Sequence, residues 1–213
     1  PEVSRILKAR DILFISDEVI CGFGRTGQLF GSQTLGTEPD LITFAKAVTN
    51  GFQPLGGVLV SDKVASVITA KGGEFAHGFT YSGHPIACAA AMATLDIMHS
   101  ENIFERVRDY AAPYLQKRWA ELGEHPIVGH TRGLGMFGSM ELVRNKKTRE
   151  RLAPDEVSGG ICRDLAMENG LVMRAVGDSM IISPPLICTH AEIDTLIERA
   201  TKALDQTAER FSV

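Results

Sequence analysis

A run of four apolar residues, Ile12–Ile15, predicts a buried β-strand that leads directly into a glycine-rich loop. The loop spaces its glycines as G-x-G-x-x-G, with Gly22, Gly24 and Gly27 at the three positions. A strand followed by this spacing is the outline of the dinucleotide-binding fingerprint. The loop therefore either receives a dinucleotide or uses its glycines for another purpose.

The residues around the loop argue against a dinucleotide. The fingerprint needs a helix to open at its glycines, because the helix N-terminus receives the pyrophosphate. Residues 28–40 show no helical period and are interrupted by glycines and a proline. The strand also ends in Asp17 and Glu18, whose carboxylates would repel a pyrophosphate. The sequence thus favours a different role for the loop.

Composition limits the classes of protein. With 213 residues, 44% of them hydrophobic, the chain can form one large domain or two small ones. The net charge of −4 without a long Lys/Arg run argues against a nucleic-acid or anionic-membrane surface. The longest nearly apolar stretch, Ile86–Leu95, is too short to span a bilayer. Four scattered cysteines and six histidines without ligand spacing predict a cytoplasmic, reducing environment and no metal site.

The predicted elements divide the chain into three parts of an α/β protein. Residues 1–99 form part of a sheet domain, residues 100–122 a connecting helix kinked at Pro113, and residues 123–213 a smaller α+β domain. Strands are expected at 12–17, 41–45, 58–60, 127–133, 136–143, 171–175 and 180–185, helices at 62–69, 84–98, 101–122, 157–169 and 190–210, and a charged loop at 144–155. The chain begins at Pro1, within a helical pattern and without Met, so we expect a piece of a longer protein.

The end of the first strand places an acid beside an apolar residue. Side chains alternate along a strand, so Asp17 and Val19 point one way and Glu18 points the other. A carboxylate next to a branched apolar side chain suits a flat, partly cationic heterocycle. Equally open is the alternative that Asp17 caps a turn and Val19 belongs to the core.

A lysine follows the second strand among apolar neighbours. Lys46 comes directly after "LITFA", and lysines are rarely found at the end of a buried strand. Burial lowers the pKa of a lysine amine, and a neutral amine can form a Schiff base. The alternative is a side chain that reaches solvent from the sheet edge.

Several ordered motifs resemble one family. They are "ISDEVICGFGRTGQLFG", "PDLITFAKAVTNGFQPLGGVLVS", "HGFTYSGHPIACAAAMATL", "GLVMRAVGDSMIISPPL" and "THAEID". Together they resemble the class III (omega) aminotransferases, which are fold-type-I enzymes dependent on pyridoxal 5'-phosphate (PLP). Among these enzymes, the motifs "FTYSGHP" and "MRAVGD…SPPL" resemble most the branch that uses pyruvate with omega-amino acids or amines.

The resemblance implies a role for five residues. Lys46 would form the Schiff base with PLP and move the substrate proton, and Asp17 would keep the pyridine nitrogen protonated. Val19 would pack on the ring face, Thr80 would bind the cofactor phosphate of the other subunit in a homodimer, and Arg174 would receive a substrate carboxylate. The three glycines would shape a tight loop beside the active site.

The resemblance covers only the C-terminal half of such enzymes. The Gly-Ser turn that binds phosphate and an aromatic residue over the ring are expected in a first half that this sequence lacks. We therefore expect this chain alone to be inactive. Two alternatives stay open: a related PLP enzyme with another outcome, such as an aminomutase or decarboxylase, and a truncated chain without activity. The sequence does not identify the amino donor.

Overall fold

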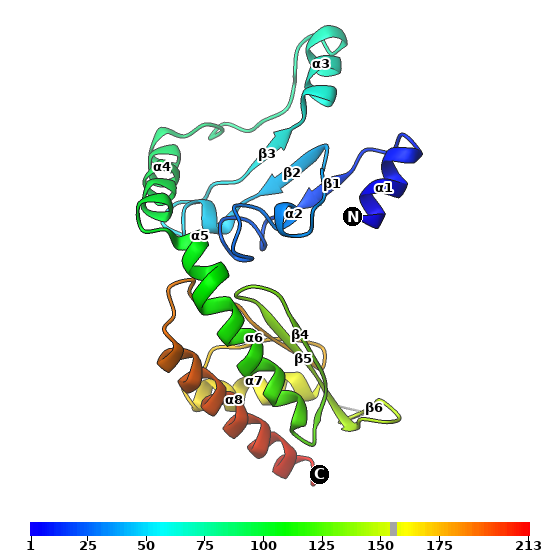
Figure 1. Cartoon of the computed structure of the whole chain (residues 1–213), viewed down its shortest axis with the longest axis vertical. Coiled ribbons are helices and arrows are strands. Elements are labelled where there is room, and N and C mark those ends of the chain that lie inside the picture. The colour runs from blue at the N-terminus through cyan, green and yellow to red at the C-terminus, as the bar shows by residue number, and fades with distance from the viewer. Residues whose placement is uncertain (154–156) are drawn as a thin grey trace. The chain divides into compact units, whose positions relative to one another are not determined.

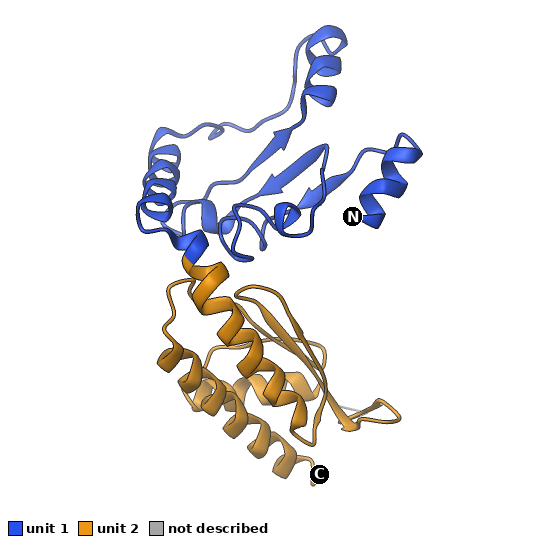
Figure 2. Cartoon of the chain, viewed as in Figure 1, with its two compact units in different colours: residues 1–105 blue, residues 106–213 orange. Residues whose placement is uncertain are grey.

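The computed structural model describes residues 1–153 and 157–213. These residues form two compact units, Pro1–Glu105 and Arg106–Val213, shown in blue and orange in Figure 2. Residues 106–122, predicted to connect two domains, belong to the second unit. The predicted three-part division itself stays a prediction.

The first unit is built on a mixed three-stranded sheet (Figure 1). Strand β1 (Ile15–Asp17) runs parallel to β2 (Leu41–Phe44), and β3 (Gly57–Val60) is antiparallel to β2. The sheet order is β1-β2-β3, and Asp17 is in register with Thr43. The three predicted strands are confirmed, although β1 begins at Ile15, three residues later than predicted.

Six helical segments of the described chain lie in or at the end of the first unit. They are α1 (Glu2–Ala9), α2 (Gly31–Thr34), the 3₁₀ turn η1 (Lys46–Val48), α3 (Asp62–Lys71), α4 (Pro85–Ser100) and α5 (Ile103–Arg106). The predicted helices at 62–69 and 84–98 are confirmed. The single turn α2 lies in a region where no helical period is visible in the sequence.

The predicted helix 101–122 is interrupted before its proline. A π-helical turn (Val107–Ala111) separates α5 from α6 (Ala112–Glu121), and Pro113 lies in the first turn of α6. Proline has no N–H to donate, and the first turn of a helix does not require one. The interruption therefore lies in the residues before Pro113, and a kink at Pro113 itself stays a prediction.

The second unit contains an antiparallel sheet in the order β4-β5-β8-β7, with β6 paired to β5. Its strands are β4 (Val128–Gly133), β5 (Gly138–Asn145), β6 (Glu150–Arg151), β7 (Arg174–Val176) and β8 (Ser179–Ile182). The short strand β6 lies in the predicted charged loop 144–155, whose residues 154 and 155 fall outside the described residues.

Helices α6 and α7 (Ser158–Glu168) contact strands of this sheet, and α8 (His190–Arg210) contacts both of these helices. Trp119 of α6 is 1% exposed and donates from Nε1 to the Ser139 carbonyl at 3.1 Å. A Cβ on Gly138 would lie 2.8 Å from the Trp119 ring, so this close approach requires glycine.

Among the described residues, no helix is long and apolar enough to cross a membrane.

A carboxylate in the β7–β8 turn joins three elements of the second unit. Asp178 accepts from the backbone N–H and hydroxyl of Ser158 at 3.0 and 2.8 Å, and from Arg151 Nε at 2.9 Å. Partial burial acts to raise the pKa of Asp178, but the hydrogen bonds from Ser158 and Arg151 outweigh it, so the pKa is lowered. A lowered pKa means that the ionised carboxylate stabilises the fold at neutral pH, and that this contribution is lost as the pH falls through the folded-state pKa.

Asp178→Asn should therefore lower the free energy of unfolding by about 1–3 kcal/mol at neutral pH, since hydrogen bonds to a charged group are lost. The deficit relative to the wild type should shrink at acidic pH, where the native carboxyl is protonated as well. Urea unfolding of the full-length protein at both pH values measures this difference. Asp164→Asn is the control, because Asp164 pairs with its exposed neighbour Arg163. A deficit that is independent of pH would contradict the expectation.

Candidate functional site

The carboxyl ends of β1 and β2 place two of the predicted site residues at one edge of the sheet. Asp17 is the last residue of β1, and Lys46 follows Phe44, the last residue of β2, by two positions. Because these neighbouring strands are parallel, their carboxyl ends lie at the same edge. Ligands of open α/β sheets bind beyond this edge. The structure thus brings Asp17 and the start of η1 to a position suited to a ligand.

The Asp17 carboxylate is held by two donors. Its Oδ1 accepts from the backbone N–H of Val19 at 3.0 Å and from Thr43 Oγ1 at 3.2 Å. The side chain is exposed, and Val19 is half-buried in the turn after β1. Asp17 thus caps the turn, as the alternative predicted, but Val19 does not belong to the core, and the carboxylate is still accessible to a ligand. Thr43 was missed in the sequence, although the parallel pairing of two consecutive strands would have pointed to it.

Lys46 has a strained backbone and an exposed side chain. Its φ of +49° lies in the left-handed region, which residues other than glycine adopt rarely and mostly at special positions. The expected burial of Lys46 is not found in this chain: the residue begins η1, and its side chain is exposed. The alternative of a lysine that reaches solvent from the sheet edge describes its position here.

The glycine loop folds back on the sheet. Phe23 N–H donates to the Leu29 carbonyl at 2.6 Å, and Gly24 and Gly27 have φ values of +94° and +84° that only glycine adopts without strain. The Phe23 ring is buried and meets Phe30 and Phe44 edge-on at centroid distances of 5.5 and 5.7 Å. The glycines therefore give the loop its shape, as the resemblance implied.

A buried carboxylate occupies the place that a pyrophosphate would take. Glu18 is 2% exposed, and its oxygens accept from the N–H groups of Gly31 at 2.8 Å and Ser32 at 2.6 Å, which open α2. These donors at the helix N-terminus are no longer available to an external anion. This supports the rejection of a dinucleotide, although α2 shows that the loop does lead to one helical turn. From the sequence, Glu18 was expected only to repel a pyrophosphate and to point away from Asp17, and its anchoring role was missed.

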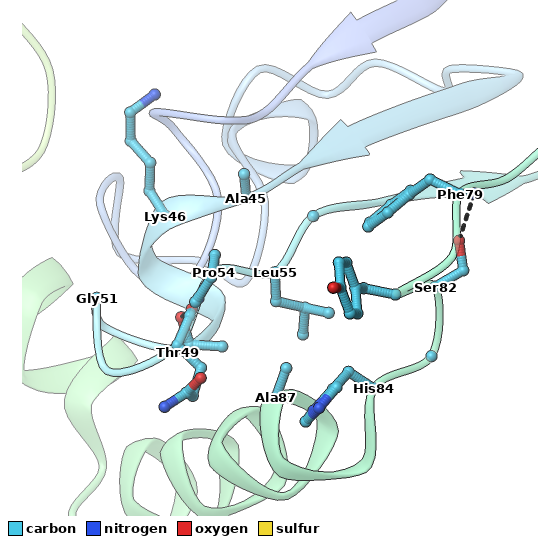
Figure 3. Close-up of a pocket in the computed structure, with 14 residues that line it drawn as sticks. Ala45, Lys46, Thr49, Gly51, Pro54, Leu55, Phe79, Ser82, His84 and Ala87 are labelled. Carbon is cyan, nitrogen blue, oxygen red and sulfur yellow. Dashed lines mark hydrogen bonds between the residues drawn. The ribbon is translucent and has the colours of Figure 1, made fainter.

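A cavity of about 960 Å³ lies beside η1 in the first unit (Figure 3). Its lining is largely apolar and includes Ala45, Pro54, Leu55, Phe79 and Ala87. Lys46 lies at its border, and in Figure 3 the Lys46 side chain points away from Leu55 and Phe79. The cavity is thus an apolar hollow next to the lysine, and the amine is directed elsewhere.

The other two predicted site residues lie apart from this edge in the chain. Thr80 is exposed in a turn that follows Phe79, whose N–H donates to Ser82 Oγ at 3.0 Å. Arg174 is exposed, begins β7 in the second unit and is in register with Ile181. The roles of Asp17, Val19, Lys46, Thr80 and Arg174 stay predictions.

Comparison with known proteins identifies relatives along almost the whole chain. The family model for class-III aminotransferases matches residues 1–204. A putrescine–pyruvate aminotransferase of Pseudomonas aeruginosa is 57% identical over 208 residues, which cover 98% of this chain and 45% of that protein. Gamma aminobutyrate transaminase 1 of Solanum lycopersicum is 41% identical over 212 residues, with 98% and 41% covered.

Solved structures of transaminases are also similar to this chain. A thermostable (S)-enantioselective omega-transaminase from Thermomicrobium roseum superposes with a TM-score of 0.92 at 42% identity, covering 97% of this chain and 46% of that one. The chain therefore spans about half the length of the relatives that it matches. The structural likeness confirms the predicted fold class, a mixed α/β fold-type-I transferase.

Proposed function

The chain belongs to the class-III aminotransferase family, and we propose that the protein carrying it moves an amino group from an omega-amino acid or amine to pyruvate, with PLP as cofactor. The observation that carries the proposal is the placement of Asp17 and Lys46 at one sheet edge, beyond the ends of β1 and β2. The name of the Pseudomonas aeruginosa relative supports pyruvate as the acceptor, because that relative is 57% identical.

The residues at this edge fit PLP. A carboxylate fixed by a backbone N–H and a hydroxyl suits a protonated pyridine nitrogen, which Asp17 would hold. The adjacent Val19 offers an apolar surface to the ring, and the Lys46 amine is accessible to the cofactor aldehyde. Thr80 would hold the phosphate of the cofactor bound to the other subunit of a homodimer.

Each of these residues would perform one step. The Lys46 amine would act as the base that moves a proton between the substrate Cα and C4′ of the cofactor. Asp17 would keep a proton on the ring nitrogen, and Arg174 would orient a carboxylate of the keto acid or amino acid through its fork of donors. When bound, PLP supplies an electron sink for the carbanion at the substrate Cα.

Two further parts of the proposal concern the chain as a unit. Because the chain spans about half of its relatives, we propose that it is inactive alone and needs further protein for the phosphate and substrate sites. A cytoplasmic location remains part of the proposal. It is supported by cysteines without a disulfide-like pattern.

Covalent labelling tests the role of Lys46. Borohydride reduction of the full-length protein with bound PLP should leave a phosphopyridoxyl group on Lys46, because a reactive amine must lie next to the aldehyde. Peptide mass spectrometry locates the group. Lys46→Ala should abolish the label, whereas Lys63→Ala, which removes a lysine paired with Asp11 at 3.1 Å, should leave it unchanged. A label on Lys63 or Lys71 would refute the assignment.

The dimer proposal predicts that cofactor affinity depends on association. Thr80→Ala should weaken PLP binding about 10- to 100-fold, the loss of one hydrogen bond to a charged group. The affinity should also vary with protein concentration, since a ligand held across an interface stabilises that interface. PLP titrations at several protein concentrations measure both effects, with Thr80→Ser as the control that keeps the hydroxyl. A monomer that binds PLP as tightly as the dimer would exclude this role.

The two half-reactions make different demands on Arg174. A carboxylate substrate pairs with the guanidinium, whereas an amine with an apolar substituent would leave a buried guanidinium unpaired at considerable cost. Because Arg174 begins β7 with an exposed side chain, we expect the side chain to turn to solvent when no carboxylate is bound.

Arg174→Ala should therefore impair the half-reaction with pyruvate or alanine far more than the half-reaction with a simple amine. The expected loss is about 2–4 kcal/mol, roughly 30- to 1000-fold in kcat/KM. Single-turnover measurements separate the two half-reactions, and Arg174→Lys shows whether charge without the fork is sufficient. Equal losses in both half-reactions would identify Arg174 as an ordinary surface residue.

A further inference from the structure

Glu18 lies between Asp17 and Val19 and is the one charged residue among those described that is buried. We propose that Glu18 is a positioning residue: its carboxylate holds the glycine loop against the end of β1 and so fixes the Val19 turn and the Asp17 carboxylate that this turn holds. The consequence for the cofactor rests on the proposed function, whereas the anchoring of the loop does not.

The Glu18 backbone connects the sheet to the loop. Its N–H donates to the Thr43 carbonyl at 2.9 Å, which extends the pairing of β1 with β2 by one residue. Its carbonyl accepts from Gly22 N–H at 2.8 Å, which closes the turn that contains Val19. Glu18 is therefore the residue at which the strand ends and the loop begins.

The Glu18 side chain connects the far end of the loop to the same point. Oε2 accepts from Gly31 N–H at 2.8 Å, and Oε1 accepts from Ser32 N–H at 2.6 Å and from Ser16 Oγ at 3.2 Å. Residues 19–30 are thus held at both ends by one amino acid. The contact with Ser16 also places the Ser16 and Glu18 side chains on the same side of the strand, away from Asp17.

The site requires a carboxylate. Two N–H donors converge at the start of α2, and an ionised carboxylate offers each of them an oxygen. Glutamine of the same size has one carbonyl oxygen, and its NH₂ group would face a donor. The space is full as well, because a Cβ on Gly31 would lie 3.0 Å from Glu18 Oε2 and 2.9 Å from Cys21 Cβ.

The anchoring reaches Asp17 through one hydrogen bond. Asp17 Oδ1 accepts from Val19 N–H at 3.0 Å, and the position of this N–H depends on the turn closed by Glu18 and Gly22. If the carboxylate anchor is lost, the loop is released, and Val19 N–H no longer holds Asp17. The orientation of the Asp17 carboxylate therefore depends on the buried glutamate beside it as well as on the Thr43 hydroxyl.

Amide hydrogen exchange in the cofactor-free full-length protein tests this link without PLP. Glu18→Gln should accelerate exchange at Val19 about tenfold or more, the factor expected for losing a hydrogen bond to a charged group. Asp40→Asn is the matched control, since Asp40 Oδ2 accepts from Phe14 N–H at 2.8 Å, before the opposite end of β1. Unchanged exchange at Val19 in Glu18→Gln, or equal acceleration in both variants, would overturn the proposal.

Gly31→Ala gives a second test if Glu18→Gln fails to fold, because it leaves the carboxylate in place and crowds it. Gly31→Ala should also accelerate amide exchange at Val19, and exchange there as slow as in the wild-type protein would contradict the proposal.

In the protein loaded with ¹⁵N-labelled PLP, Glu18→Gln should shift the ring-nitrogen resonance toward that of Asp17→Asn, while Asp40→Asn should leave it unchanged. A resonance unaffected in Glu18→Gln but moved in Asp17→Asn would refute the positioning role. No PLP binding, or no effect of Asp17→Asn, would refute the proposed function, while amide exchange would still decide the anchoring.

Discussion

The parallel pairing of β1 with β2 is the constraint on which the candidate site depends. The pairing puts Asp17 in register with Thr43, so the Thr43 hydroxyl reaches the Asp17 carboxylate. It also brings the strand end that leads to Lys46 to the same edge. An antiparallel pair would send these two strand ends in opposite directions. A carboxylate and a lysine far apart in the sequence thus come to the same edge of the sheet through the pairing of these two strands.

The glycine loop shows how one sequence pattern can serve two kinds of site. In a dinucleotide fold, the N–H groups at a helix start receive an external pyrophosphate. Here the N–H groups of Gly31 and Ser32 receive the protein's own carboxylate, Glu18. The helix is only one turn long, and its first N–H groups close the loop. The anion required by the exposed N–H groups is thus supplied by the residue next to Asp17.

Long helices could be predicted from the sequence, whereas single helical turns and very short strands could not. Helix α8 was predicted with the observed bounds, and in the structure a capping box of Thr189 and Glu192 marks its start. The single turn α2 and the two-residue strand β6 have no period of their own, since side-chain or cross-strand bonds create them. At the site, Asp17 and Lys46 could be chosen from strand ends. The exposure of Lys46 and the bond from Thr43 depend on tertiary context.

Asp17 and Lys46 are both exposed to solvent in this chain, whereas the proposed chemistry needs them in surroundings of low dielectric constant. Charges that face water interact weakly, because the effective dielectric constant is high, and the same pair gains several-fold in strength when water is excluded. The edge described here supplies the carboxylate, the amine and a fixed geometry between strands. Under the proposed function, the low-dielectric surroundings must come from protein that covers this edge. Glu18 can fix the direction of Asp17 before that covering is in place, because its own hydrogen bonds are already buried.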